Sequence, residues 1–329
     1  MTKLFLHIGL GKAASSLLQS EIFPHIAKFL NFEYVGNENI PYNDLEIKNK
    51  VKVTQHCHNM IYGKKTEKIT FNNNIVISNE GLSSYRQPQF YEEFAEKNFF
   101  AFGSNAHVIL VIRKPTDFLN SVYVQTCIHE KPFQNPEHFF LNKEKYSERL
   151  PNSTFLIDSF DYNQLIKFYS EKFNKFSVIK FEQLHKMEWA KEIFNLNKEQ
   201  VIFLKNKFLK NSLNKSMGVY STNFIKYFSK ILRLFSLEYK NKFSNSIILQ
   251  RFKKENIKNE YEVRRNISFV KKLIINFNLF INKPYIIDKI FGYKKITLNL
   301  EEIKGLDINK LEETYNNLPD FKTFIKRSD

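Results

Sequence analysis

The sequence predicts an α/β protein with a mostly parallel β-sheet flanked by helices. Short apolar segments that resemble buried strands alternate along the chain with longer segments of helical spacing. This alternation is typical of βαβ units, whose strands pair in parallel. Of the 329 residues, 43% are hydrophobic, which is enough to bury a sizeable core. Glycine or polar residues directly follow most of the predicted strands, as they do where such sheets bind ligands.

The predicted elements follow from the spacing of apolar residues. Residues 3–8 (KLFLHI) form the first strand, and a glycine turn at 9–11 leads into a helix over about 15–29. The other predicted strands are 74–78, 107–112 and 176–181, and the other predicted helices are 90–101, 116–129 and most of 183–209. Pro115 stands in the first turn of the helix over 116–129, where proline is well tolerated. Residues 32–70 show no clear period, so they stay unassigned.

The character of the chain changes at about residue 205. Residues 205–295 hold 21 Lys/Arg and 5 Asp/Glu, and the whole chain has a formal net charge of +16. We therefore predict a core over 1–204 and a basic, mainly helical region over 205–329. This region either completes the core or forms an appendage that faces the acceptor or a membrane. A basic apolar surface suits peripheral membrane contact or an acidic glycan. A solvated lysine-rich face explains it equally well.

Composition excludes several classes of protein. Cys57 and Cys127 are the only cysteines, so a disulfide framework and a four-cysteine zinc site are excluded. No segment approaches the roughly 18 apolar residues of a membrane span, and the short apolar start lacks the basic cluster of a signal peptide. No nucleic-acid motif is present, which disfavours nucleic acid as a partner. We expect a cytoplasmic protein, with peripheral contact at the inner membrane face through residues 205–295 as an option.

The residues Gln55-His56-Cys57-His58 include three adjacent metal-ligand types. Three potential ligands at consecutive positions do not match the ordinary spacing of zinc ligands. We expect an ordinary loop here and no metal site.

The first predicted strand is followed by a loop that can bind an anion. Its amides precede a helix, where N–H groups and the helix dipole favour negative charge, and Lys12 adds a cation. A Walker A motif is excluded because Leu6 replaces its first glycine and Ala13 its magnesium-binding hydroxyl. A dinucleotide fingerprint G-x-G-x-x-A fits formally over 9–14, with Glu33 at about the distance of a ribose-binding acid.

A second loop follows the predicted strand over 107–112. Here Arg113, Pro115, Ser121 and Tyr123 match the pattern R-x-P-x-x-x-x-x-S-x-Y. An arginine at the tip of a strand presents a planar fork that suits a phosphate. The simplest alternative is an ordinary junction of strand and helix with a surface arginine.

Taken together, the two loops resemble the donor-binding motifs of sulfotransferases. The first motif of that family usually reads G-x-x-K-[SA]-G-[TS]-[TS], and Gly9, Lys12, Ser15 and Ser16 match it. Ala14 stands where the family usually has glycine. The resemblance covers about residues 3–185 and implies a P-loop-like sheet. The segment 176–184 also resembles the late strand of the family core, which is followed by a glutamate.

This resemblance implies a donor, 3′-phosphoadenosine 5′-phosphosulfate (PAPS), and no metal. By resemblance, Lys12 would stabilise the leaving phosphate, and Arg113 and Ser121 would hold the 3′-phosphate. Lys215, in the polar segment 211–218, is a further candidate for the 3′-phosphate. The residues that would cradle the 5′-phosphate are Gly9, Gly11, Lys12, Ala13, Ala14, Ser15 and Ser16.

A hydroxyl acceptor also needs a general base, and Glu80 is the candidate. It follows the predicted strand over 74–78 and resembles the base of glycan-directed sulfotransferases. A capping or ion-paired role for Glu80 is equally compatible with its position. Histidines are alternatives as the base, namely His7, His56, His58 and His107, of which His7 and His107 are expected to be packed on strands.

The resemblance favours a bacterial enzyme that sulfates a carbohydrate or glycolipid. Two other functions stay open at this point. One is an NAD(P)-dependent oxidoreductase that uses the G-x-G-x-x-A loop. The other is a non-catalytic, basic, membrane-associated binding protein with a degenerate nucleotide fold.

Overall fold

The computed structural model describes most of the first 210 residues and the C-terminal segment. The described residues are 2–36, 44–84, 87–129, 136–141, 155–210, 220, 290–292, 294 and 297–326. The chain divides into two compact units. The first unit comprises 1–119, 140–214 and 300–329, and the second comprises 120–139 and 215–299.

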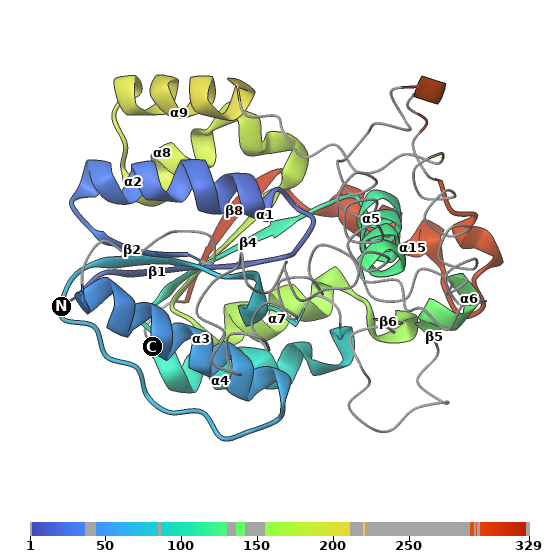
Figure 1. Ribbon diagram of the computed structural model, residues 1–329, viewed down its shortest axis with the longest axis horizontal. Coiled ribbons are helices and arrows are strands. Elements are labelled where there is room, and N and C mark those ends of the chain that lie inside the picture. Colours follow the sequence, from blue (N-terminus) through green and yellow to red (C-terminus); the bar gives the residue numbers. More distant parts are fainter. Residues whose placement is uncertain are drawn as a thin grey trace, which may run out of the picture. The chain divides into compact units, whose positions relative to one another are not determined.

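A six-stranded sheet in the order β2-β3-β1-β4-β7-β8 forms the centre of the first unit (Figure 1). Its strands are β1 (Leu4–Gly9), β2 (Glu33–Gly36), β3 (Ile75–Ser78), β4 (His107–Ile112), β7 (Lys175–Lys180) and β8 (Phe321–Ile325). The first five run parallel, and β8 pairs antiparallel with β7. The predicted α/β fold with a mostly parallel sheet is therefore confirmed. A short parallel pair, β5 (Phe140–Leu141) and β6 (Phe155–Leu156), lies outside this sheet.

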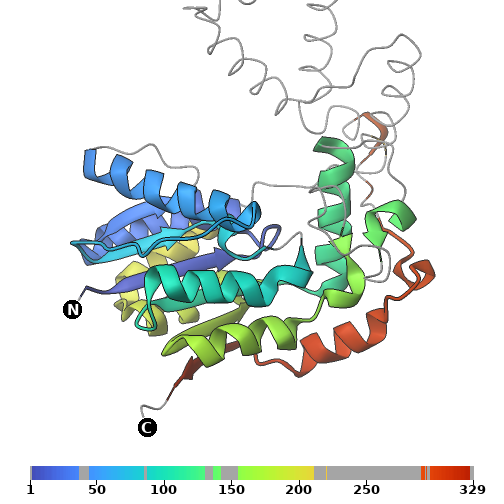
Figure 2. The same ribbon diagram turned by 90° about the horizontal axis from the view of Figure 1, so that it is seen from below.

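Helices cover both faces of the sheet (Figure 1). One face carries α2 (Phe23–Leu30), α8 (Glu188–Phe194) and α9 (Lys198–Lys210). The other carries α3 (Asp44–Ile61), α4 (Tyr91–Phe102) and α7 (Tyr162–Lys172), of which α4 and α7 lie side by side (Figure 2). The remaining helices are α1 (Ser15–Leu17), the π-helix Leu18–Ile22, α5 (Pro115–His129), α6 (Pro136–Phe139) and α15 (Ile308–Asn317). Short 3₁₀ turns span Glu80–Leu82, Pro88–Phe90, Ile157–Ser159, Phe181–Lys186 and Leu300–Glu302.

The apolar residues of the central strands build the core. Every residue of β4 is buried, as expected for a parallel strand that is covered on both faces. Ile109 and Val111 pack with Phe23 of α2 and Trp189 of α8 in one buried cluster. The indole N–H of Trp189 donates to the Leu184 carbonyl (3.1 Å), so this large side chain is buried without losing its hydrogen bond. The resulting core holds the strand ends, and the loops that follow them, in fixed positions.

The four predicted strands and the helices predicted over 15–29, 90–101 and 116–129 are confirmed, with ends shifted by one or two residues. The segment 183–209 is mainly helical, as predicted, but it is divided between the 3₁₀ turn Phe181–Lys186, α8 and α9. The unassigned segment 32–70 contains β2 and the whole of α3. The loop expected at Gln55-His56-Cys57-His58 is wrong, because these residues lie within α3. His56 is buried there and hydrogen-bonds the side chain of Asn98 on α4 (2.9 Å). The packing of α3 therefore depends on partners that the local pattern does not show.

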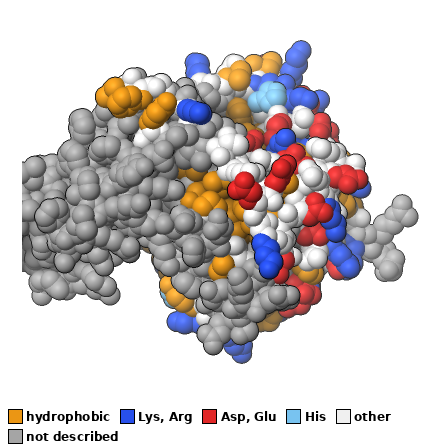
Figure 3. Space-filling view, turned by 90° about the vertical axis from the view of Figure 1, so that its right-hand side faces the viewer, with side chains coloured by type: hydrophobic (Ala, Val, Ile, Leu, Met, Phe, Trp, Pro, Cys, Tyr) orange, Lys and Arg blue, Asp and Glu red, His pale blue; other side chains and the backbone are white. Residues whose placement is uncertain are grey.

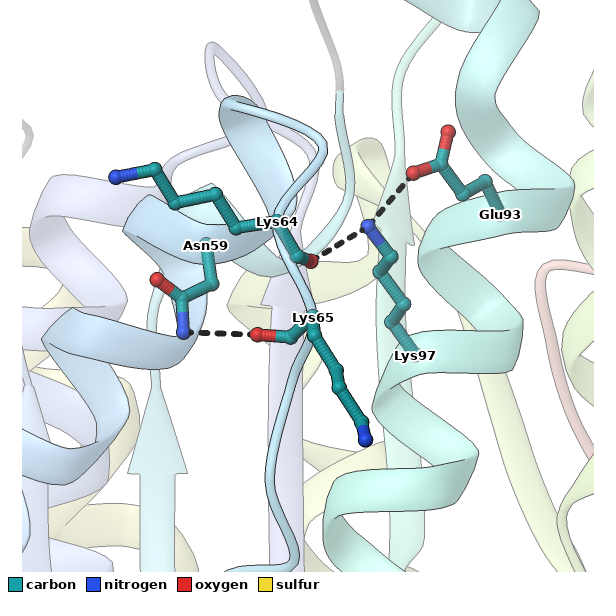
Figure 4. A network of polar contacts seen from close by, with 5 residues as sticks. All are labelled: Asn59, Lys64, Lys65, Glu93 and Lys97. Atoms are coloured by element: carbon teal, nitrogen blue, oxygen red, sulfur yellow. Dashed lines mark hydrogen bonds and ion pairs between the residues drawn. The ribbon is translucent and has the colours of Figure 1, made fainter.

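A polar network fixes the turn after α3 (Figure 4). Lys97 donates to the carbonyl of Lys64 (3.0 Å) and pairs with Glu93 (2.7 Å). Asn59 donates to the carbonyl of Lys65 (3.1 Å). From this turn the chain runs through residues 66–74 to the start of β3.

The C-terminal segment returns to the first unit. There β8 extends the sheet beyond β7, so part of the region 205–329 completes the core. Most of the basic stretch 205–295, and with it the predicted helical character and membrane contact, lies outside the described residues. On the face in Figure 3, acidic and basic side chains of the described residues are interspersed. Within the described part of the chain, no helix is long and apolar enough to cross a membrane.

Candidate functional site

Three loops meet at the carboxyl edge of the sheet. β1 lies between β3 and β4, and all three strands run parallel, so the residues after Gly9, Ser78 and Ile112 emerge side by side. The chain places β2 and β3 on one side of β1 and β4 on the other, which makes this a topological switch point. Open α/β sheets bind ligands at such points. The candidate site therefore lies where the predicted motifs converge.

The loop after β1 is tightly wound. Gly9, Lys12 and Ala14 have positive φ angles of 97°, 70° and 61°. A side chain at Gly9 would place its Cβ 3.3 Å from the Cα of Glu80, so only glycine allows this close approach. The side chain of Ala13 is buried in the core, and its amide donates to the carbonyl of Leu10 (3.3 Å). Ala13 thus holds the shape of the loop.

A continuous helical stretch begins directly after this loop. It runs from Ser15 through the π-helix to the end of α2 at Leu30. The residue at its N-cap, Ala14, makes no side-chain capping bond. The first amides of a helix have no acceptor within the helix, and the dipole places partial positive charge there. This end of the helix can therefore accept an anionic group from outside.

Glu80 lies against the loop after β1. The amide of Asn79 donates to the carbonyl of His7 (3.0 Å), and the side chain of Asn79 accepts from the amide of Gly81 (2.8 Å). These bonds fix the turn that carries Glu80. The hydroxyl of Ser15 then donates to Oε2 of Glu80 (2.9 Å). The structure thus brings the candidate base into contact with a residue of the candidate phosphate loop.

Arg113 joins the two loops that the sequence singled out. Its Nη1 donates to the carbonyl of Lys12 (3.0 Å), and its guanidinium carbon lies 5.0 Å from the centre of the Phe181 ring. Its own carbonyl accepts from the hydroxyl of Tyr162 (2.7 Å). Nε of Arg113 is buried and has no hydrogen-bond partner among the described residues. A buried charged donor is costly without an acceptor, and an anion would supply one.

The other residues predicted to contact phosphate are Gly11, Ser16, Ser121 and Lys215. Gly11 is buried in the loop, and Ser16 is half-buried in the first turn of the helix. Ser121 and Tyr123 lie on α5 and belong to the second unit, where the Tyr123 ring packs 5.7 Å from that of Phe139. A shared contact of Ser121 and Arg113 with a phosphate stays a prediction. Lys215 lies outside the described residues.

The two histidines on strands are packed, as expected. Nδ1 of His7 hydrogen-bonds the hydroxyl of Ser78 (2.7 Å), and burial lowers the pKa of His7 to about 3. Nε2 of His107 hydrogen-bonds Ser177 (2.8 Å), and burial, with a smaller effect of Lys175, lowers its pKa to about 4. Both rings are buried in the sheet and are weak bases at these pKa values, which favours Glu80 over them as the base.

Glu33 lies at the wrong edge of the sheet for a ribose contact. It is the first residue of β2, and its carboxylate accepts from Asn49 (2.8 Å) and Asn73 (2.7 Å). The loop after β1 is at the opposite, carboxyl edge. The dinucleotide interpretation therefore lacks its acidic residue, although the glycine spacing remains.

Sequence reasoning missed the residues that contact Arg113. Tyr162 and Phe181 have no motif or spacing that links them to residue 113. Within the described ranges, no three His, Cys, Asp or Glu side chains gather as a metal site would require. Comparisons with protein-family models and with curated proteins give no match. The function must therefore be argued from the residues and their geometry.

Proposed function

We propose that this chain is a sulfotransferase that moves a sulfonate group from PAPS to a hydroxyl of an acceptor. The observation that carries the proposal is the hydrogen bond from Arg113 to the carbonyl of Lys12. It joins two motifs that are 101 residues apart and that resemble the 5′- and 3′-phosphate loops of one enzyme family. Because β1 and β4 are adjacent parallel strands, both loops emerge at the switch point of the sheet, where open α/β sheets bind ligands.

The residues present fit a nucleotide with two separate anionic groups. Lys12 and the first amides of the helix after β1 suit the 5′-phosphosulfate, because they combine a cation with N–H donors at a helix N-terminus. Among the described residues, the buried Nε of Arg113 has no acceptor. Arg113 therefore suits the 3′-phosphate, because a guanidinium can donate two parallel hydrogen bonds. Ser121 and Lys215 are proposed as further ligands of that phosphate, on the resemblance alone.

PAPS, when bound, supplies an activated sulfonate. In the transfer, a bond forms between the acceptor oxygen and sulfur while the bond between sulfur and the bridging phosphate oxygen breaks. Lys12 would stabilise the negative charge that develops on the leaving phosphate. Glu80 would accept the proton that the acceptor hydroxyl loses. The motifs imply no metal for this step.

The acceptor is proposed to be a carbohydrate or glycolipid, because Glu80 follows β3 as the base does in glycan-directed members of the resembled family. We further propose that the enzyme is bacterial and acts in the cytoplasm, with contact to the inner membrane face through residues 205–295. Two other functions define the alternative outcomes of the test below. They are an oxidoreductase that binds NAD(P) at the glycine loop, and a binding protein without catalysis.

Thermal unfolding with adenosine 3′,5′-bisphosphate, NAD or ATP tests the proposal. Saturating bisphosphate should raise the melting temperature by about 5 °C, since a ligand at 100 times its Kd adds about 2.7 kcal/mol of stability. Arg113→Ala should abolish this rise, and Arg113→Lys should restore only part of it, because lysine keeps the charge without the fork. Lys28→Ala removes an exposed cation from the far end of α2 and should keep the full rise.

Each alternative has its own outcome. Stabilisation by NAD but not by the bisphosphate would favour the oxidoreductase. No stabilisation by any of the three nucleotides would favour the non-catalytic binding protein. Stabilisation by the bisphosphate that survives Arg113→Ala would contradict the proposed place of the 3′-phosphate.

A further inference from the structure

We propose that the C-terminal helix α15 positions Arg113 and thereby sets selectivity for a nucleotide that carries a 3′-phosphate. Glu312 is the positioning residue, and it acts through Lys114 and Thr116. This inference rests on the proposed function, because it assigns the 3′-phosphate to Arg113. It goes further in giving the segment that returns from the C-terminal region a role in the site.

Glu312 holds both residues that flank Pro115. Oε2 of Glu312 lies 3.1 Å from the ammonium of Lys114, and Oε1 accepts a hydrogen bond from the hydroxyl of Thr116. Only Arg113 and Lys114 separate the end of β4 from the start of α5. Fixing Lys114 and Thr116 therefore leaves the backbone of Arg113 little freedom. The proline that follows Lys114 restricts this junction further.

The helix that carries Glu312 is itself fixed to the sheet. Ile308, Glu312 and Tyr315 lie at positions i, i+4 and i+7, so they share one face of α15, and Ile308 and Tyr315 are buried. The hydroxyl of Tyr315 donates to Glu182, which follows β7. The ammonium of Lys180 lies 5.0 Å from the centre of the Tyr315 ring. α15 is thus anchored at the end of β7 and reaches across to the end of β4.

A second support comes from α7. Tyr162 is fully buried, and its hydroxyl donates to the carbonyl of Arg113 (2.7 Å). The rings of Tyr162 and Tyr315 are 6.2 Å apart, so the two supports contact each other. The backbone around Arg113 is therefore fixed from both sides, while its Nε has no hydrogen-bond partner in the part of the chain that the structure describes. That arrangement preorganises the guanidinium and leaves its Nε able to donate a hydrogen bond to a ligand.

The charge of Glu312 also influences how strongly the site attracts a phosphate. A carboxylate near an anion site would repel the ligand, but Glu312 is paired with Lys114. Loss of the carboxylate leaves Lys114 unpaired, which strengthens the attraction for every phosphate alike. It also loosens the junction that aims Arg113. Selectivity, measured as a ratio of affinities, separates these two effects, whereas a single affinity does not.

The experiment compares adenosine 3′,5′-bisphosphate with adenosine 5′-monophosphate by titration calorimetry on the full chain. The ratio of their dissociation constants measures selectivity for the 3′-phosphate. Glu312→Gln should reduce this ratio by about threefold to tenfold, the range expected for hydrogen bonds of ordinary strength. Glu313→Gln, which alters the exposed neighbour on the same helix, should leave the ratio unchanged.

A double-mutant cycle shows whether Glu312 acts through Lys114. Lys114→Met should lower the ratio of dissociation constants as Glu312→Gln does. The ratio in the double variant should be no lower than in the single variant with the lower ratio. A mere loss of stability in Glu312→Gln would lower the melting temperature and leave the ratio as it is, which would overturn the inference. If wild type discriminates between the nucleotides and Glu312→Gln does so equally, only the role of α15 fails. If wild type does not discriminate, the proposed function fails and takes this inference with it.

Discussion

The hydroxyl of Ser15 donates a 2.9 Å hydrogen bond to Oε2 of Glu80 and so links the first residue of a helix to the carboxylate after β3. Ser15 is 5% exposed, which leaves this contact little competition from water. A serine hydroxyl has one proton to donate. It therefore cannot donate to Glu80 and to a phosphate at the same moment. The pairing in the structure assigns this proton to Glu80, which makes Ser15 a residue that orients the proposed base.

Glu80→Gln tests the proposed base. Glutamine has nearly the same shape and can still accept from Ser15, but it cannot take up the acceptor's proton. The rate of sulfonate transfer from labelled PAPS to acceptor glycans should fall by about 10²- to 10⁴-fold. The rise in melting temperature with the bisphosphate should stay. Glu92→Gln, at an exposed position in the first turn of α4, should have no effect on either measurement. Full activity of Glu80→Gln would return the role of base to a histidine.

Ser15→Ala should act on the same step with a smaller effect. Removing one hydrogen bond to a charged group costs about 1.5–3 kcal/mol, so kcat should fall roughly tenfold or more while the KM for PAPS changes little. The effect should vanish in the background of Glu80→Gln, because both substitutions remove one function. Ser16→Ala changes a residue of the proposed 5′-phosphate cradle and should instead raise the KM for PAPS with little change in kcat. A rise in KM with unchanged kcat in Ser15→Ala would show that its hydroxyl serves the phosphate instead.

Ala14→Gly should stabilise the protein. Ala14 has a φ of 61°, in the left-handed region where a Cβ costs about 1–2 kcal/mol and glycine costs nothing. The greater conformational entropy of glycine in the unfolded chain offsets part of this relief of strain. The free energy of unfolding, measured in urea, should therefore rise by about 1 kcal/mol. Ala13→Gly is a control with the opposite sign, because Ala13 is buried in the core and has no positive φ. A destabilised Ala14→Gly would show that the loop does not carry this strain.

The sequence predicted the strands that are buried on both faces of the sheet. β4 is apolar throughout because helices cover both faces of the sheet, so its residues identify it without further context. β2 has four residues, and β8 is an antiparallel edge strand that contains Lys322. Neither strand has a run or an alternation of apolar residues that distinguishes it from the segments around it. β8 exists because it pairs with β7, a partner more than a hundred residues earlier in the chain.

In the candidate site, the sequence predicted the residues but not their contacts. Lys12, Glu80 and Arg113 could be found because motif spacing places chemistry directly after predicted strands. Their contacts could not, since the bonds from Arg113 to the Lys12 carbonyl and from Ser15 to Glu80 depend on which strands are neighbours. Strand order is a property of the whole sheet. Glu33 shows the converse, because a suitable spacing along the chain put an acid at the wrong edge.

The buried histidines predict how stability depends on pH. The pKa of folded His107 is about 4, whereas a histidine in an unfolded chain titrates near 6.5. Between these values the unfolded state binds more protons, so the free energy of unfolding should fall as the pH is lowered from 6.5 to 4. His107 should contribute about 1.4 kcal/mol per pH unit within this window. His7, with a pKa of about 3, should act in the same direction and down to a lower pH.

Urea unfolding at pH 5 and pH 6, on wild type and His107→Gln, measures this contribution. Glutamine can still hydrogen-bond Ser177 but does not titrate. Because an unfolded histidine is only partly protonated at pH 6, the free energy of unfolding of the variant should fall by about 1.2 kcal/mol less than that of wild type between the two pH values. His58→Gln replaces an exposed histidine on α3 and should follow wild type. Equal losses in wild type and His107→Gln would mean that His107 is protonated in the folded state. Its ring would then not be the neutral, packed group that its place between Phe5 and Ser177 requires.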